Sequence, residues 1–177
     1  AYIMKNALII FSTVDGHTKK ICEYIADKIK TNYSITLLSI DNTEKVNLLS
    51  YQLIIIGASI RYGKHQPSVY NFIKNNSDKL DSINNAFFSV SAVARKPGKD
   101  SPDTNPYMIK FLTQINWKPH KLAVFSGKID YKKYNFVNKQ IIRFIMWVTK
   151  GPTNTSKVYE FTDWAAVDQF SDSLNHK

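Results

Sequence analysis

Hydroxyl-bearing side chains gather between Ser12 and Thr18, directly after a short apolar run. The segment reads Ser-Thr-Val-Asp-Gly-His-Thr. The run before it, 7–11, has the composition of a strand buried on both faces, and isoleucine then recurs every four residues from 21 to 29, as on the inner side of a helix. A turn that opens a helix presents free backbone N–H groups and the positive end of the helix dipole. This turn is therefore predicted to bind an anion, most commonly a phosphate. A plain helix cap is the alternative, since Ser, Thr and Asp also cap helices without a ligand.

Strand-like and helix-like segments alternate along the whole chain. Strands are expected at 7–11, 35–40, 53–58, 86–90 and 122–125, and helices at 18–29, 67–80, 107–115 and from 164 onward. One short helix fits in 41–50, and residues 158–161 are also strand-like. This alternation predicts an α/β protein in which a doubly wound parallel sheet carries helices on both faces.

Three loops should meet at the carboxyl ends of these strands, where such sheets bind ligands. They are residues 12–18, 59–65 and 91–98. A flat aromatic cofactor with a phosphate tail would fit, with its phosphate on the first loop and its ring between the other two. Tyr62 is the candidate for stacking on the ring. Gly57 is expected to allow a close backbone approach, as is Gly63.

The segment 128–156 does not fit the strand–helix alternation and is predicted to be an insertion within a single domain, residues 4–177. Its centre, 134–149, is predicted to be helical, with a broad apolar face and a basic stripe. Between 128 and 150 there are six basic residues and one acid, Asp130. This composition suits a helix lying in a membrane interface, but also a lid over the substrate or a face packed on the parent domain or a second subunit.

The bulk composition narrows the class of protein. The 177 residues suffice for one domain with a full core, and a net charge of +10 suggests an acidic or anionic partner. The single cysteine, Cys22, allows no internal disulfide, is expected to be a core residue, and suits a reducing cytoplasm. No metal site is expected. Residues 1–3 are interpreted as a non-native extension before Met4, and neither a secretory signal nor a membrane-spanning segment is predicted.

Several strings resemble one family. Ser12–Thr18 is similar to the FMN phosphate loop of flavodoxins, although flavodoxins carry a hydroxyl where this chain has Asp15. Because a carboxylate would repel phosphate, Asp15 is expected to turn toward backbone N–H groups. The strings Gly57–Gly63, Val93–Pro97 and Thr162–Trp164 resemble the flavodoxin-like, menaquinone-dependent protoporphyrinogen dehydrogenases of bacteria. The resemblance extends from Met4 to the last helix and implies a flavodoxin-like sheet in the order 2-1-3-4-5.

The resemblance implies FMN-dependent oxidation of protoporphyrinogen IX in three two-electron steps, with electrons passed to a membrane quinone, menaquinone or ubiquinone. The expected cofactor-binding residues are Ser12, Thr13, Asp15, Gly16, His17, Thr18, Ser59, Ile60, Arg61, Tyr62, Gly63, Ser91, Ala92, Val93 and Arg95. Of these, Arg61, Tyr62 and Arg95 are the candidates closest to the ring, and no general base is assigned. His65 and His120 are expected to be bystanders.

Basic side chains would bind the two propionates of the substrate, and apolar ones would meet the membrane or quinone. The substrate candidates are Lys96, Lys128, Lys132 and Lys133. The membrane or quinone candidates are Phe136, Ile141, Phe144, Ile145 and Trp147. The expected location is the cytoplasm, peripheral on the inner face of the cell membrane, with a homo-oligomer possible.

Two other functions on the same fold stay open. A flavodoxin-type electron carrier is disfavoured by the basic charge and the apolar insertion. An NAD(P)H:quinone reductase is weakly disfavoured because the chain has no Gly-x-Gly-x-x-Gly string. Nucleic acid is not an expected partner, because the basic residues alternate with apolar ones instead of exposed stacking aromatics.

Overall fold

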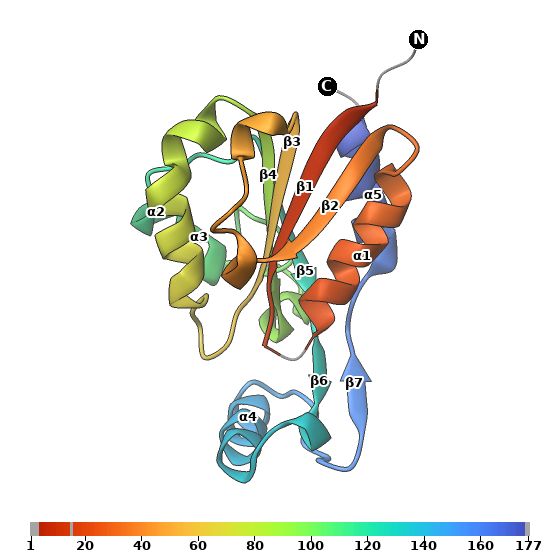
Figure 1. Cartoon of the computed structure of the whole chain (residues 1–177). Coiled ribbons are helices and arrows are strands. Elements are labelled where there is room, and N and C mark those ends of the chain that lie inside the picture. Colours follow the sequence, from red (N-terminus) through yellow and green to blue (C-terminus); the bar gives the residue numbers. More distant parts are fainter. Residues whose placement is uncertain (1–3, 15, 176–177) are drawn as a thin grey trace.

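A five-stranded parallel sheet forms the centre of the protein in this computed structural model, which describes residues 4–14 and 16–175 (Figure 1). The expectations for residues 1–3 and for Asp15 lie outside the described residues. The strands are β1 (Lys5–Ser12), β2 (Tyr33–Ser39), β3 (Leu53–Ser59), β4 (Asn84–Ser91) and β5 (Lys121–Ser126). Their order, β2-β1-β3-β4-β5, confirms the predicted topology.

Helices cover both faces of the sheet (Figure 1). They are α1 (His17–Ile29) and α5 (Trp164–Asn175) on one face, and α2 (Pro67–Asp81) and α3 (Pro106–Gln114) on the other. Pro67 opens α2, where its missing N–H is not needed. The Asn105 side chain caps α3 by accepting the N–H groups of Tyr107 and Met108. The 41–50 region forms two 3₁₀ turns, η1 (Ile40–Asn42) and η2 (Leu48–Ser50), where one short helix was expected.

Each face of the sheet has its own apolar core. Leu8, Ile54 and Phe87 contribute to the core under α2 and α3. Cys22 and Phe88 belong to the core under α1 and α5, and burial raises the pKa of the Cys22 thiol well above its ordinary value. The prediction that Cys22 is a core residue is thus confirmed.

Gly57 serves packing inside the sheet, which corrects the expectation that it permits approach to a cofactor. A Cβ atom placed on Gly57 would lie 2.2 Å from the Cζ atom of Phe88, a fully buried ring on the adjacent strand. The missing side chain therefore creates the space that the Phe88 ring fills.

Replacing Gly57 by alanine is expected to lower the free energy of unfolding by about 2 kcal/mol, because the Phe88 ring must move within a close-packed core. Urea unfolding at fixed pH measures the loss. In the double variant G57A/F88L the smaller side chain at position 88 makes room for the new methyl group. The double variant should therefore lose less stability than the sum of the losses in G57A and F88L measured separately. Strictly additive losses would contradict this packing explanation.

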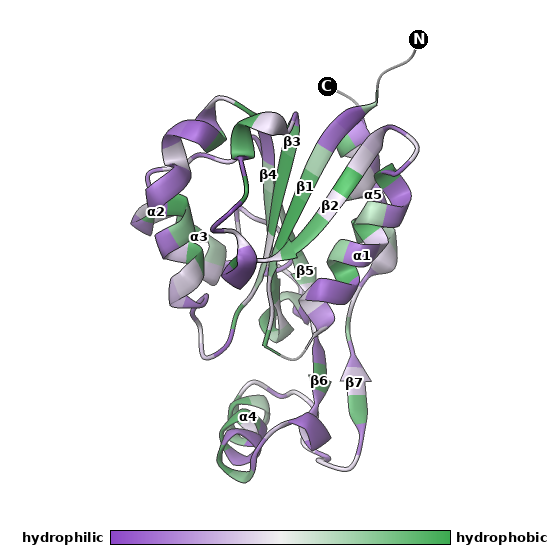
Figure 2. Ribbon diagram, viewed as in Figure 1, coloured by the Kyte–Doolittle hydropathy of each residue, from purple (hydrophilic) through white to green (hydrophobic). Residues whose placement is uncertain are grey.

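A small lobe, defined here as residues 128–160, projects from the carboxyl edge of the sheet between β5 and α5 (Figure 1). Its stem is an antiparallel ribbon of β6 (Lys128–Asp130) and β7 (Val158–Glu160), which carries the 3₁₀ turn η4 (Tyr131–Lys133) and α4 (Phe136–Val148). The strand-like segment near residue 158 thus belongs to this ribbon, whose existence was not predicted. Ile129, Tyr131 and Met146 form the lobe's core. Hydrophobic residues also colour much of the outside of α4 (Figure 2).

Candidate functional site

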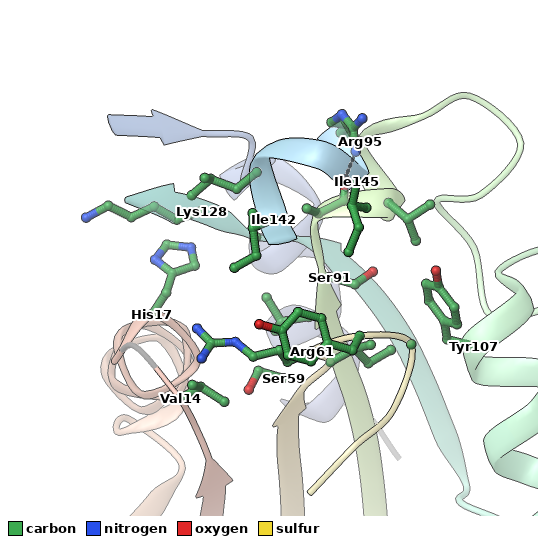
Figure 3. Close-up of a pocket in the computed structure, with 18 of the residues that line it drawn as sticks. Val14, His17, Ser59, Arg61, Ser91, Arg95, Tyr107, Lys128, Ile142 and Ile145 are labelled. Atoms are coloured by element: carbon green, nitrogen blue, oxygen red, sulfur yellow. Dashed lines mark hydrogen bonds between the residues drawn. The ribbon is translucent and has the colours of Figure 1, made fainter. Parts of the chain in front are cut away.

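A cavity of about 490 Å³ lies between the lobe and the carboxyl ends of the strands (Figure 3). The loops after β1, β3 and β4 line one side, and α4 lines the other through Ile142 and Ile145. The three loops thus meet at the carboxyl ends of the strands, as the sheet topology predicts. The lobe encloses the cavity from the other side.

The first loop is organised by its own hydroxyls. Gly16, at φ +92°, precedes α1, and its N–H donates to the Thr13 Oγ1 atom at 2.9 Å. The Ser12 hydroxyl donates to Gln66 Oε1 at 2.6 Å. The side chains of Ser12 and Thr13 thus bind the protein itself, while His17 and Thr18, in the first turn of α1, line the cavity.

Two buried hydroxyls in the cavity wall have no hydrogen-bond partner among the described residues. Thr18 Oγ1 lies at the amino end of α1, and Ser91 Oγ lies at the end of β4. Both residues are almost fully buried. Burying a hydroxyl without a hydrogen-bond partner costs about 1–3 kcal/mol of folding free energy. A bound ligand that accepts or donates these hydrogen bonds would remove that cost.

A short hydrogen-bond chain joins His17 to the start of α5. The Thr162 hydroxyl donates to the Ser126 carbonyl oxygen at 3.0 Å, and its oxygen lies 2.6 Å from His17 Nε2. Since the hydroxyl has one hydrogen and gives it to the carbonyl, His17 Nε2 must be the donor. This orients the His17 ring beside the cavity and gives a structural role to the Thr162–Trp164 string.

The second loop turns sharply between Arg61 and Lys64. The two residues exchange backbone hydrogen bonds at 3.0 and 3.1 Å, with Tyr62 at φ +53° and Gly63 at φ +77° between them. Positive φ at both central positions is the type I′ turn, which is unusual for a bulky residue such as tyrosine. Strained backbone of this kind is found preferentially at functional sites.

Side chains of the second loop bind the lobe. The Tyr62 hydroxyl donates to Asn138 Oδ1 at 2.5 Å, and the Arg61 guanidinium lies 5.0 Å from the centre of the Tyr134 ring. These contacts hold α4 over the cavity and place a fixed positive charge beside it.

The third loop forms the 3₁₀ turn η3 (Ala92–Arg95), and Arg95 ties it to the lobe. Its Nη1 donates to the Ala92 carbonyl at 2.7 Å, and its Nη2 donates to the carbonyl and hydroxyl of Thr149 at 3.4 and 3.3 Å. Burial lowers the pKa of the Arg95 guanidinium. The pKa of Lys96 is lowered by desolvation and then by nearby positive charges, the first of them Arg95.

The structure brings most of the expected cofactor residues to this cavity, together with one of the four expected substrate lysines, Lys128. Lining it are His17, Thr18, Ser59, Ile60, Arg61, Tyr62, Gly63, Ser91, Ala92, Val93, Arg95 and Lys128. Outside its lining are Ser12, Thr13, Gly16, Lys96, Lys132 and Lys133. On the exposed side of α4 are Phe136, Ile141, Phe144 and Trp147. Ile145, expected with this last group, instead faces the cavity.

Sequence reasoning did not assign the lobe's side of the cavity. Ile142, Ile145, Met146 and Thr149 line it. Their spacing of i, i+3, i+4 and i+7 is the signature of one helix face, so the signal was present but was hidden by apolar residues around most of α4. Tyr107, from α3, also lines the cavity, and no local pattern distinguished it.

Within the described part of the chain, no helix combines the length and the hydropathy needed to cross a bilayer. The described residues also contain no group of three or more His, Cys, Asp or Glu side chains placed to hold a metal ion.

Comparison of the sequence with known proteins identifies the family of this chain. A sequence model of the flavodoxin domain matches residues 8–156. A protoporphyrinogen IX dehydrogenase [quinone] of Leishmania major is 40% identical over 94% of this chain and 73% of its own length. The protein of the same name in Escherichia coli K12 is 37% identical over 97% and 95%.

Solved structures agree on the fold. A Streptococcus pneumoniae TIGR4 flavodoxin superposes with a TM-score of 0.52 at 12% identity, covering 96% of this chain and 97% of that one. At this identity the likeness concerns the fold alone. The sequence relatives, at 37–40% identity over nearly the whole chain, identify the family. The chain belongs to the flavodoxin-domain family that contains the quinone-linked protoporphyrinogen IX dehydrogenases.

Proposed function

We propose that this protein binds FMN and oxidises protoporphyrinogen IX to protoporphyrin IX, with the electrons passed to a quinone at a membrane surface. The observation that carries the proposal is the cavity itself, where partnerless buried hydroxyls of a flavodoxin-type fold face an apolar lobe. The named relatives support the substrate and the acceptor.

The residues present fit FMN. Thr18 Oγ1 and the backbone N–H groups at the amino end of α1 suit a phosphate, and His17 stands beside them. Ser91 and the second and third loops would frame the ring. Bound FMN would supply the two-electron redox chemistry, and the protein supplies position and electrostatics.

The chain's own side chains shape the reaction space. Ile142 and Ile145 close the cavity opposite Ser91 and restrict access of water (Figure 3). Arg61, oriented by Tyr134, contributes positive charge, which favours a reduced, anionic ring. Arg95 acts by holding η3 against the end of α4 at Thr149.

The substitution Thr18→Val is expected to raise the Kd for FMN about 30-fold, because it removes a hydrogen bond to a charged group. The stability of the cofactor-free protein should stay equal or rise, since the lost hydroxyl is buried without a partner among the described residues. FMN titration by fluorescence quenching and urea unfolding without FMN measure the two effects. Thr113→Val, on the exposed side of α3, is the control and should leave the Kd for FMN unchanged.

The outer face of α4 supports attachment to a membrane. Six large apolar side chains there are exposed, between 42% and 75%: Phe136, Val137, Ile141, Phe144, Trp147 and Val148. Exposed basic residues flank them, namely Lys132, Lys133, Arg143 and Lys150. An apolar face bordered by positive charge is the pattern of a helix lying in the interface of an anionic bilayer. This attachment would place the cavity, on the other side of α4, next to a lipid-dissolved quinone.

The reaction is tested anaerobically with the purified, FMN-loaded protein. Protoporphyrinogen IX alone should bleach the yellow colour, and menaquinone in vesicles should restore it. Bleaching by NADPH without any response to the porphyrinogen would replace the proposal with a quinone reductase. Protein that cannot be made yellow by FMN would end it.

A further inference from the structure

A second cleft, of about 430 Å³, opens between α2 and α3 beside the cavity described above. The two share Gly63 and Tyr107 in their walls. The Tyr107 ring would lie 3.1 Å from a Cβ atom on Gly63, so the glycine lets the turn and the ring form a thin partition. The two spaces are therefore neighbours, with only this turn and this ring between them.

The second cleft is lined by positive and aromatic side chains. Lys64 and Lys110 are exposed on its rim, and none of the described residues that line it is acidic. The ion pairs found among the described residues, Lys28–Asp168 and Lys30–Asp27, lie elsewhere. The two ammonium groups are thus available to an anionic ligand from solution.

The floor of this cleft is aromatic and uncharged. The His65 ring lies 4.5 Å from the centre of Phe111 and 6.4 Å from that of Tyr70, and its Nε2 lies 3.0 Å from the Ser89 hydroxyl. The Tyr70 hydroxyl donates to Gln114 Oε1 at 3.2 Å, and both residues line the cleft. An aromatic floor below a cationic rim suits the apolar ring edge and carboxylate arm of a tetrapyrrole.

Size argues for the same ligand. A cofactor of the size of FMN and a tetrapyrrole each need several hundred cubic ångströms, so 490 Å³ cannot enclose both. Most of the porphyrinogen must then lie outside the first cavity. Of the four lysines expected for its propionates, Lys128 lines the first cavity, whereas Lys96, Lys132 and Lys133 line neither space.

We propose that this second cleft is a carboxylate-binding subsite of the substrate, in which Lys64 and Lys110 hold a propionate while the macrocycle extends past Gly63 and Tyr107 toward the flavin cavity. This inference rests on the proposed function, and it assigns substrate recognition to the α2–α3 edge. Both lysines are exposed, so together they are worth about tenfold in affinity, and less at high salt.

The test compares protoporphyrin IX with its dimethyl ester, which has the same ring but no carboxylate charge. Binding is followed by the Soret absorbance of the porphyrin, with the FMN-loaded protein. The wild-type protein should prefer the free acid about tenfold, and K64Q/K110Q should lose this preference while keeping its FMN content. The KM for protoporphyrinogen IX should rise by the same factor with kcat at saturation unchanged. K74Q/K79Q, which removes the same charge from exposed positions of α2, is the matched control and should keep the preference.

Two outcomes overturn the inference in distinguishable ways. If the wild type prefers the free acid and K64Q/K110Q keeps that preference, the subsite lies elsewhere although the proposed function stands. Loss of the preference in K132Q/K133Q alone would place it at η4. If the wild type binds neither porphyrin and protoporphyrinogen IX does not bleach the flavin, the proposed function fails together with the subsite.

Discussion

Replacing both Phe144 and Trp147 by serine is expected to weaken binding to anionic phospholipid vesicles about 1000-fold. The two side chains are 61% and 70% exposed, and their ring centres lie 6.1 Å apart on the outer face of α4. Burying an aromatic side chain of this size contributes about 2 kcal/mol, so losing two removes about 4 kcal/mol of transfer free energy. Co-sedimentation with vesicles of mixed phosphatidylglycerol and phosphatidylcholine measures the change.

A matched control separates membrane contact from general loss of surface hydrophobicity. Leu49 and Ile109 are also exposed, at 60% and 45%, but lie outside the lobe. The double variant L49S/I109S should sediment like the wild type, and both double variants should retain FMN. Equal losses in the two variants, or none in F144S/W147S, would contradict attachment through α4.

Acidification from pH 6.5 to pH 4 is expected to remove about 3 kcal/mol of stability through His65 alone. Burial among aromatic rings lowers the pKa of His65 from 6.5 to about 4. The unfolded chain therefore binds a proton in this pH range that the folded protein does not, and stability falls as the pH falls through it. Below pH 4 both states are protonated at this position, and the loss is complete.

Two substitutions identify the group responsible. In His65→Gln the titrating ring is gone, so the part of the acid destabilisation that lies between pH 6.5 and pH 4 should disappear. His120→Gln is the control, because the His120 side chain is exposed. The carboxyl groups of Asp27 and Asp168 have pKa values below their ordinary range, so their contributions are lost only at lower pH. Unfolding in urea at pH 7, 5.5 and 4.5 measures each slope, and an unchanged slope in H65Q would contradict the assignment.

The main fold was predictable because strands buried on both faces are near-continuous apolar runs, as in β1 and β3. The lobe's ribbon was not, because three-residue strands such as β6 and β7 are too short to show a two-residue alternation. The packing role of Gly57 was not predicted for a different reason. A glycine that fits a buried ring on a neighbouring strand looks the same in sequence as one that fits a ligand.

The candidate site was predictable as three loops but not as a set of contacts. Its hydrogen bonds join residues far apart in the chain: His17 and Thr162 are 145 positions apart, and Tyr62 and Asn138 are 76 positions apart. Local patterns cannot report such pairs. Local patterns also did not show that the Ser12 hydroxyl donates a hydrogen bond to Gln66, which lies in a different loop. The residue types predicted which loops form the site, and tertiary packing determines which of their atoms face the cavity.

The ribbon at the base of the lobe brings the two ends of the inserted segment together. The Phe161 N–H donates to the Gly127 carbonyl at 2.9 Å, and Lys128 is paired with Glu160. To the parent sheet, the thirty-odd residues in between are therefore equivalent to a single tight turn, whatever they contain. A segment whose two ends are fixed side by side can therefore vary in length or sequence without a change in the strands that carry it.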